Sequence, residues 1–198
     1  MSDDLHARKQ HEAEVAQRHA DEIHVRAPGL PRMAEIVQRV ARENASAKTK
    51  LAKFYAVADG VAEAIYPYSA CLGGCSHCCN IAVLISQLEA DLIGTRIGVK
   101  AQRVTRPTPD RTAEARYFGV PCPFLAAGPC AIYDARPMAC RLHFNIGETP
   151  FFCELGQPRD FAGVPNLDLN DFWEQLANAT YPRMYADIRE FFPNGVNP

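Results

Sequence analysis

Hydrophobic residues along most of the chain recur at the spacing of helices. Between residues 36 and 65 they follow one another at steps of three, four or seven, which places them on one helical face: Ile36, Val40, Ala47, Leu51, Phe54, Ala58, Val61 and Ile65. This pattern predicts one long core helix, in which Gly60 could introduce a kink. Pro67 and the Gly73-Gly74 pair should then end the regular structure.

Three further helices are predicted downstream. Ser86 and Glu89 have the spacing of a capping box and predict a helix start at that point. Asp134 predicts the N-cap of a short helix that carries Cys140, with a proline in its first turn. Residues 170–192 show helical spacing interrupted by Pro182, so a bent or divided helix is expected there. Residues 100–120, 120–128 and 147–165 should be irregular because they are rich in turn-forming residues.

The N-terminal segment differs from the rest of the chain. Residues 1–27 have helical composition but only three large apolar residues, Leu5, Val15 and Ile23, too few for a wide buried stripe. We therefore predict a polar helical N-terminal arm, either solvated or ordered by a protein partner or a second copy of the chain. Residues 28–198 should form a single α-helical cysteine-cluster domain. The predicted fold class is mainly α, with irregular cysteine-rich loops around a metal centre, packed on several helices.

Composition narrows the functional classes. A chain of 198 residues with 47% hydrophobic residues can build one domain with a sizeable core. The net charge of −2 argues against general electrostatic binding of nucleic acid. We see neither a leader with a basic and then an apolar region nor a membrane span of about 20 uncharged residues. These features predict a cytoplasmic protein with no nucleic-acid or membrane partner, in which a dense cysteine pattern favours metal binding or catalysis over disulfides.

The cysteines carry the clearest chemistry. Four of the eight fall within nine positions, and the full set is Cys71, Cys75, Cys78, Cys79, Cys122, Cys130, Cys140 and Cys153. Thiolates are strong ligands of zinc, iron and iron-sulfur centres, so we predict that all eight bind metal, within a core of residues 71–153. Neighbouring side chains project in different directions, which suits Cys78 and Cys79 to two centres or to opposite sides of one cluster. Two sets of four ligands, or one site with spare cysteines, both remain open.

Nearby polar residues could assist. His77 and His143 could each replace a thiolate as a ligand, although a supporting or exposed position is the more usual one. Arg136 and Arg141 could offset the negative charge of the thiolates or donate hydrogen bonds to sulfur, or could form ordinary salt bridges. The alternative for the cysteines themselves is that some only fill the core, since a free cysteine behaves as a small hydrophobic residue.

Three blocks of the chain carry a family resemblance. They are Cys71-x3-Cys75-x2-Cys78-Cys79, then Cys122-Pro-Phe-Leu, then Cys130-Ala-Ile-Tyr-x2-Arg136-Pro-x2-Cys140-Arg141. In order and spacing they resemble the cysteine-cluster family of zinc- or iron-chelating proteins (YkgJ-like, CxxCxxCC type), which is related to flagellin N-methylase. One departure is the three residues between the first two cysteines, where the family name has two. The resemblance implies metal binding and says little about a reaction.

Three functional classes follow, and the sequence does not decide whether the protein is an enzyme. The first is a protein in which thiolates hold zinc or iron, including a 4Fe-4S cluster, and the metal organises the fold. The alternative is an iron-sulfur, S-adenosylmethionine-dependent enzyme similar to protein methyltransferases, because Cys71-x3-Cys75-x2-Cys78 has the spacing of radical S-adenosylmethionine enzymes. Too little chain follows for the expected barrel, and no glycine-rich nucleoside-binding turn is present. Thiol redox chemistry lacks the βαβ context that it usually requires.

Overall fold

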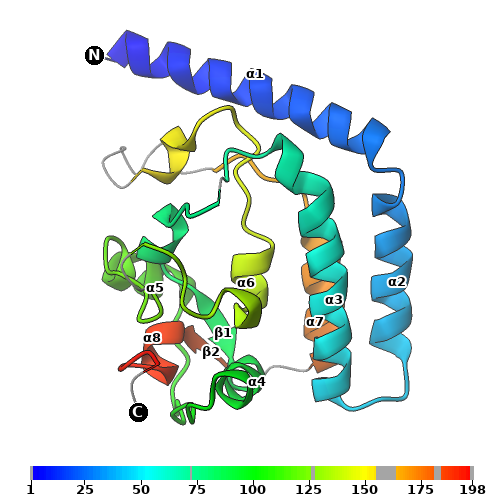
Figure 1. The fold of residues 1–198 in the computed structure, drawn as a ribbon, viewed down its shortest axis with the longest axis vertical. Coiled ribbons are helices and arrows are strands. Elements are labelled where there is room, and N and C mark those ends of the chain that lie inside the picture. The colour runs from blue at the N-terminus through cyan, green and yellow to red at the C-terminus, as the bar shows by residue number, and fades with distance from the viewer. Residues whose placement is uncertain (1, 72, 126–127, 155–163, 181–183, 197–198) are drawn as a thin grey trace.

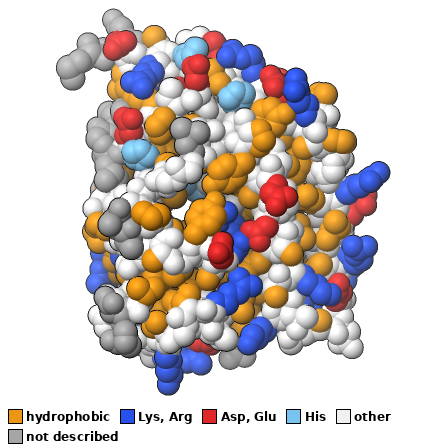
Figure 2. All heavy atoms as spheres, viewed as in Figure 1, with side chains coloured by type: hydrophobic (Ala, Val, Ile, Leu, Met, Phe, Trp, Pro, Cys, Tyr) orange, Lys and Arg blue, Asp and Glu red, His pale blue; other side chains and the backbone are white. Residues whose placement is uncertain are grey.

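The computed structural model describes residues 2–71, 73–125, 128–154, 164–180 and 184–196. Long helices form one side of the molecule, and short elements joined by loops form the other (Figure 1). The predicted fold class, mainly α, is confirmed. None of the described helices is both long and apolar enough to cross a membrane. Acidic and basic side chains are interspersed over the face shown in Figure 2.

The predicted long helix over residues 36–65 is in fact two helices. Helix α2 (Leu30–Arg42) and helix α3 (Ala47–Ile65) lie side by side and pack on α7 (Asn170–Thr180) (Figure 1). Ser46 caps the start of α3, where its hydroxyl accepts a hydrogen bond from the Thr49 N–H at 3.1 Å. The apolar pattern continues across the break because α2 and α3 bury their apolar faces in the same core cluster.

Gly60 does not interrupt α3. A Cβ atom at this position would lie 3.1 Å from the Cε atom of Met33 on α2. The glycine therefore leaves room for the end of the Met33 side chain and does not produce the kink that the sequence suggested.

Helix α1 (Ser2–Arg26) crosses the end of the α2–α3 pair (Figure 1). The helix was predicted, but its description as a solvated arm needs correction. Val15, Ala16 and Ile23 are buried, and two of them belong to the main core cluster. Glu12 is 1% exposed and accepts hydrogen bonds from the loop around Thr149. A buried polar contact of this kind has no hydrophobic periodicity, so the sequence pattern did not reveal it.

A small sheet joins two distant parts of the chain. Strand β1 (Leu84–Ser86) pairs antiparallel with β2 (Tyr185–Asp187), so that Ile85 lies opposite Ala186. The predicted helix over residues 170–192 is therefore wrong at residues 185–187, and the helix expected at Ser86 is confirmed as α4 (Gln87–Ile97) with its capping box. The predicted bend at Pro182 lies outside the described residues. Helix α8 (Ile188–Phe191) follows β2 directly.

Two smaller helices also depart from the prediction. Helix α5 (Asp110–Tyr117) lies within the segment expected to be irregular. The helix that carries Cys140, α6 (Met138–Arg141), begins after Pro137 rather than at Asp134, which instead lies in the 3-10 turn η3 (Tyr133–Ala135). The residue before a proline is disfavoured in helical conformation, so the chain turns at Arg136 before it enters α6.

Candidate metal centre

The first four cysteines lie on the loop between η1 (Tyr66–Tyr68) and β1. Its second half forms the 3-10 turn η2 (His77–Asn80), which contains Cys78 and Cys79. Gly74 has a φ of +87°, a conformation that side chains other than glycine rarely adopt, and it turns the chain between Cys71 and Cys75. Cys75 is exposed, and the other three are partly buried.

Cys122 and Cys130 belong to a second loop that is tied to the first. The Cys122 N–H donates to the Cys79 carbonyl at 2.6 Å. A β-bridge joins Leu125 to Cys130, and the Ala131 N–H donates to the Phe124 carbonyl at 2.8 Å, so this loop folds back on itself. Backbone hydrogen bonds thus place the second loop beside Cys79.

Seven of the eight predicted ligands line one pocket of about 270 Å³. These are Cys71, Cys75, Cys78, Cys79, Cys122, Cys130 and Cys140. They come from the first loop, the second loop and α6, segments that are far apart in the sequence. The apolar part of the lining comes from side chains such as Phe124 and Ile132. All eight cysteines are free thiols, so no disulfide framework accounts for their proximity.

Cys153 lies at the end of η4 (Pro150–Cys153) and does not line this pocket. Its sulfur accepts a hydrogen bond from the Asn145 side-chain amide at 3.5 Å. It is also close enough to Cys71 and Cys75 for charge on those sulfurs to raise its pKa. The eighth predicted ligand is therefore beside the first loop, on the side of the molecule that α1 covers.

The buried thiols resist ionisation. Burial raises the pKa of four of them, to about 11 for Cys122 and Cys153 and in the same direction for Cys130 and Cys140. The pKa of Cys79 is raised first by its hydrogen bond with Cys78 and then by burial. Repulsion between neighbouring sulfurs adds to the effect in every case. These thiols are neutral without a cation, so metal binding must displace protons.

Arg136 and Arg141, which the sequence treated alike, have different roles. Arg136 lines the pocket, lies 4.0 Å from the Tyr133 ring centre, and lowers the pKa of Cys130 and Cys140 through its charge. Arg141 is buried, forms an ion pair with Asp59, and donates to backbone carbonyls. Of these two arginines, Arg136 is the one placed to offset thiolate charge, and Arg141 forms the ordinary salt bridge.

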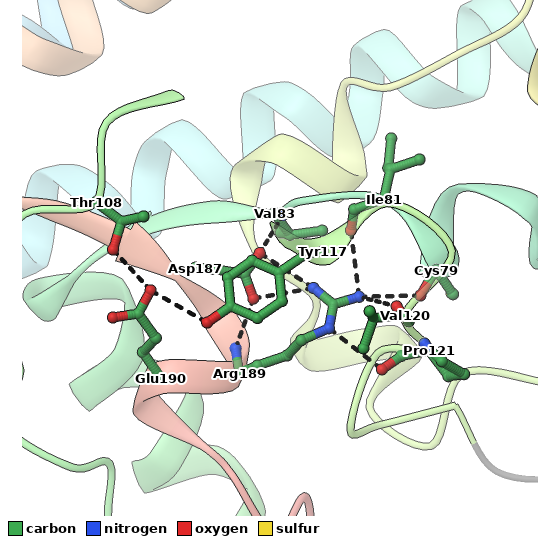
Figure 3. A network of polar contacts seen from close by, with 10 residues as sticks. All are labelled: Cys79, Ile81, Val83, Thr108, Tyr117, Val120, Pro121, Asp187, Arg189 and Glu190. Atoms are coloured by element: carbon green, nitrogen blue, oxygen red, sulfur yellow. Dashed lines mark hydrogen bonds and ion pairs between the residues drawn. The ribbon is translucent and has the colours of Figure 1, made fainter. Parts of the chain in front are cut away.

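A residue that the sequence did not single out, Arg189, braces both loops. Its guanidinium donates two hydrogen bonds to Asp187, at 2.9 and 3.0 Å. It also donates to the backbone carbonyls of both loops, including Cys79 at 3.4 Å and Val120 at 2.5 Å (Figure 3). Its charge lowers the pKa of Cys79 and Cys122. Its partners are mainly backbone carbonyls 68 to 110 residues away, so no local motif reveals it.

The two candidate histidines are also distinguished. His143 lines the pocket, and burial lowers its pKa, which favours the neutral imidazole that binds metals. His77 lies in η2 but is not part of the lining.

The sulfur atoms surround one pocket but do not point at a common position. Among the described residues, no three or more Cys, His, Asp or Glu side chains are arranged as a finished metal site. The chemistry of the donor set nevertheless fits zinc or iron, since many soft sulfur atoms surround one pocket and two arginines offset their charge.

Comparison with known protein families decides the classification of this region. Residues 70–156 match the model of CxxCxxCC, described as "Putative zinc- or iron-chelating domain". This stretch, less than half of the chain, is similar to the CxxCxxCC family. The match spans all eight cysteines and leaves α1, α2, α3 and α7 outside, so it identifies the metal-chelating region and not the helices that support it. Comparisons with curated proteins and with solved structures give no match.

Proposed function

We propose that this protein binds zinc or iron through the thiolates of its eight cysteines, and that the bound metal organises the fold. The observation that carries the proposal is the pocket lined by seven thiols from separate segments. Ionised thiols gathered at one place repel one another, so without a cation the buried ones stay protonated, and a bound cation would stabilise their thiolate form. Their free state also supports a reducing compartment, the cytoplasm.

A bound metal would supply a cross-link between segments that the helices alone do not join. The first loop, the second loop, α6 and η4 carry the thiols and contain little regular structure of their own. Arg136 and Arg189 would counter the negative charge that remains on the sulfurs. This arrangement fits a site closed by protein ligands, which leaves no open position for a substrate.

The alternative is an iron-sulfur, S-adenosylmethionine-dependent enzyme similar to protein methyltransferases. The spacing of Cys71, Cys75 and Cys78 supports it, and so does the pocket beside them. However, small-molecule sites usually measure about 300–1,000 Å³, and this pocket is about 270 Å³ before any metal enters. Little room is left for a nucleoside cofactor, so the metal-organised protein is favoured.

Elemental analysis and an absorption spectrum of protein prepared without oxygen would test the proposal. We expect stoichiometric metal: colourless protein indicates zinc, whereas a brown chromophore with labile sulfide indicates an iron-sulfur cluster. Cys75→Ser and Cys78→Ser should each release metal and lower the melting temperature. Full metal content and unchanged stability in both variants would refute the assignment. Binding heat on addition of S-adenosylmethionine would favour the alternative.

A further inference from the structure

The eight thiols divide into two groups by their surroundings. We call Cys79, Cys122, Cys130 and Cys140 the inner group. A backbone hydrogen bond joins Cys122 to Cys79, and a β-bridge holds Cys130 on the same loop as Cys122. Cys122, Cys130 and Cys140 all pack against the second core cluster, which also contains Phe124 and Ile188. The inner group is therefore attached to the small-sheet side of the molecule.

Cys71, Cys75, Cys78 and Cys153 form what we call the outer group, and Asn145 connects it. The Asn145 carbonyl accepts a hydrogen bond at 2.8 Å from the Ala70 N–H, next to Cys71. The side-chain amide of this 1% exposed residue donates to the Cys153 sulfur and, at 2.9 Å, to the Thr149 carbonyl. Hydrogen bonds thus link the start of the first loop to the segment that carries Cys153.

Cys78 and Cys79 mark the boundary between the groups. They are adjacent on η2 and their side chains are hydrogen-bonded to each other, so the two groups meet at this pair. Cys79 is held beside Cys122 by the backbone, which assigns it to the inner group. Cys78 then completes a second set of four with Cys71, Cys75 and Cys153.

Helix α1 is hydrogen-bonded to the segment that precedes Cys153. The Glu12 carboxylate accepts hydrogen bonds from the Glu148 N–H at 2.8 Å, from the Thr149 N–H at 3.3 Å and from the Thr149 hydroxyl. The same hydroxyl accepts a hydrogen bond from the Phe151 N–H in the first turn of η4. Gly147 makes room for this contact, because a Cβ atom there would collide with the Glu12 carboxylate. Docking of α1 therefore sets the position of η4 and of Cys153 at its end.

We propose that the protein holds two separate four-thiolate centres, an inner and an outer one, and that docking of α1 through Glu12 completes the outer centre. This proposal rests on the proposed function, since it assigns the ligands of the same metal. It predicts unequal behaviour: the inner centre depends on the small-sheet side, and the outer centre depends on a helix that lies outside the family match.

Zinc titration of the reduced, metal-free full chain, followed by native mass spectrometry, tests the division. The wild type should bind two zinc ions, and Cys140→Ser and Cys153→Ser should each retain one at the other centre. If Cys140→Ser does not fold, as judged by circular dichroism, Cys130→Ser serves as the inner variant. Loss of both ions in the inner and the outer variant alike, or one ion in the wild type, would overturn the division and leave the proposed function intact. Failure of the wild type to bind zinc, and iron in a parallel titration, would instead refute the proposed function.

The role of α1 is tested with variants that contain all eight cysteines. Glu12→Gln should weaken one of the two zinc ions by about 10–100-fold, the usual effect of removing a group that supports metal ligands. Gly147→Ala should have the same effect because it displaces the carboxylate without changing charge. Two matched controls should bind zinc as the wild type does. They are Glu22→Gln, on the exposed face of α1, and Gly29→Ala, where an added Cβ would meet no atom within 4 Å. Equal weakening of both ions, or of neither, in Glu12→Gln and Gly147→Ala would reject the role of α1.

Discussion

Replacement of Arg189 by methionine should destabilise the protein far more than replacement of a surface arginine. The Arg189 side chain is 9% exposed, and its partner Asp187 is completely buried. Removing one partner of a buried ion pair costs about 3–5 kcal/mol, because the other charge is left without compensation. For a chain of this size that corresponds to a decrease in melting temperature of roughly 6–20 °C.

Thermal unfolding of reduced, metal-free protein, followed by circular dichroism, measures this effect without a contribution from lost metal. The matched control is Arg103→Met, because Arg103 pairs with Asp91 on the surface, where the two side chains are 71% and 45% exposed. Such pairs contribute about 0–1 kcal/mol. Arg189→Lys should fall between the two, since lysine keeps the charge but cannot donate to Asp187 and to the loop carbonyls at the same time. Equal destabilisation by Arg189→Met and Arg103→Met would show that the brace contributes nothing of the kind inferred here.

Four other outcomes are expected. Burial raises the pKa of Glu89, so the contribution of this residue to stability is full at low pH and is lost as pH rises through the raised pKa. The free energy of unfolding of Glu89→Gln, measured in urea, should therefore increase relative to that of the wild type as pH rises. Parallel pH curves for the two proteins would contradict this. Gly60→Ala should raise stability by up to about 1 kcal/mol, because helix propensity improves and only the flexible end of Met33 must move. Gly94→Ala should instead lower stability in the same assay, because its Cβ would collide with the Val99 carbonyl. Removal of metal by a chelator under reducing conditions should lower the melting temperature, and an unchanged melting temperature would argue against an organising role for the metal.

Local signals in the sequence predicted local features well. The capping box at Ser86 and Glu89 and the apolar face of α3 depend on residues close together in the chain, and the structure contains both. The break between α2 and α3 was missed because apolar spacing continues across it. Strand β2 was missed because its partner, β1, is about 100 residues away, and three residues carry no strand pattern by themselves.

The candidate site shows the same division. Cysteine spacing was enough to indicate a metal-chelating region, and the family match confirms this. It could not indicate that Asn145, Glu12 and Arg189 hold the thiol-bearing segments, because these contacts are single polar interactions between distant residues. The proposed grouping of the thiols rests on such contacts, so it required the structure.

The position of Arg189 in the chain has a consequence for synthesis. The ribosome completes all eight cysteines, the last at residue 153, before it adds β2 and α8. A nascent chain therefore contains all of its thiols before the residue that braces two of their loops has been made. The two loops gain this brace only after translation has passed residue 189.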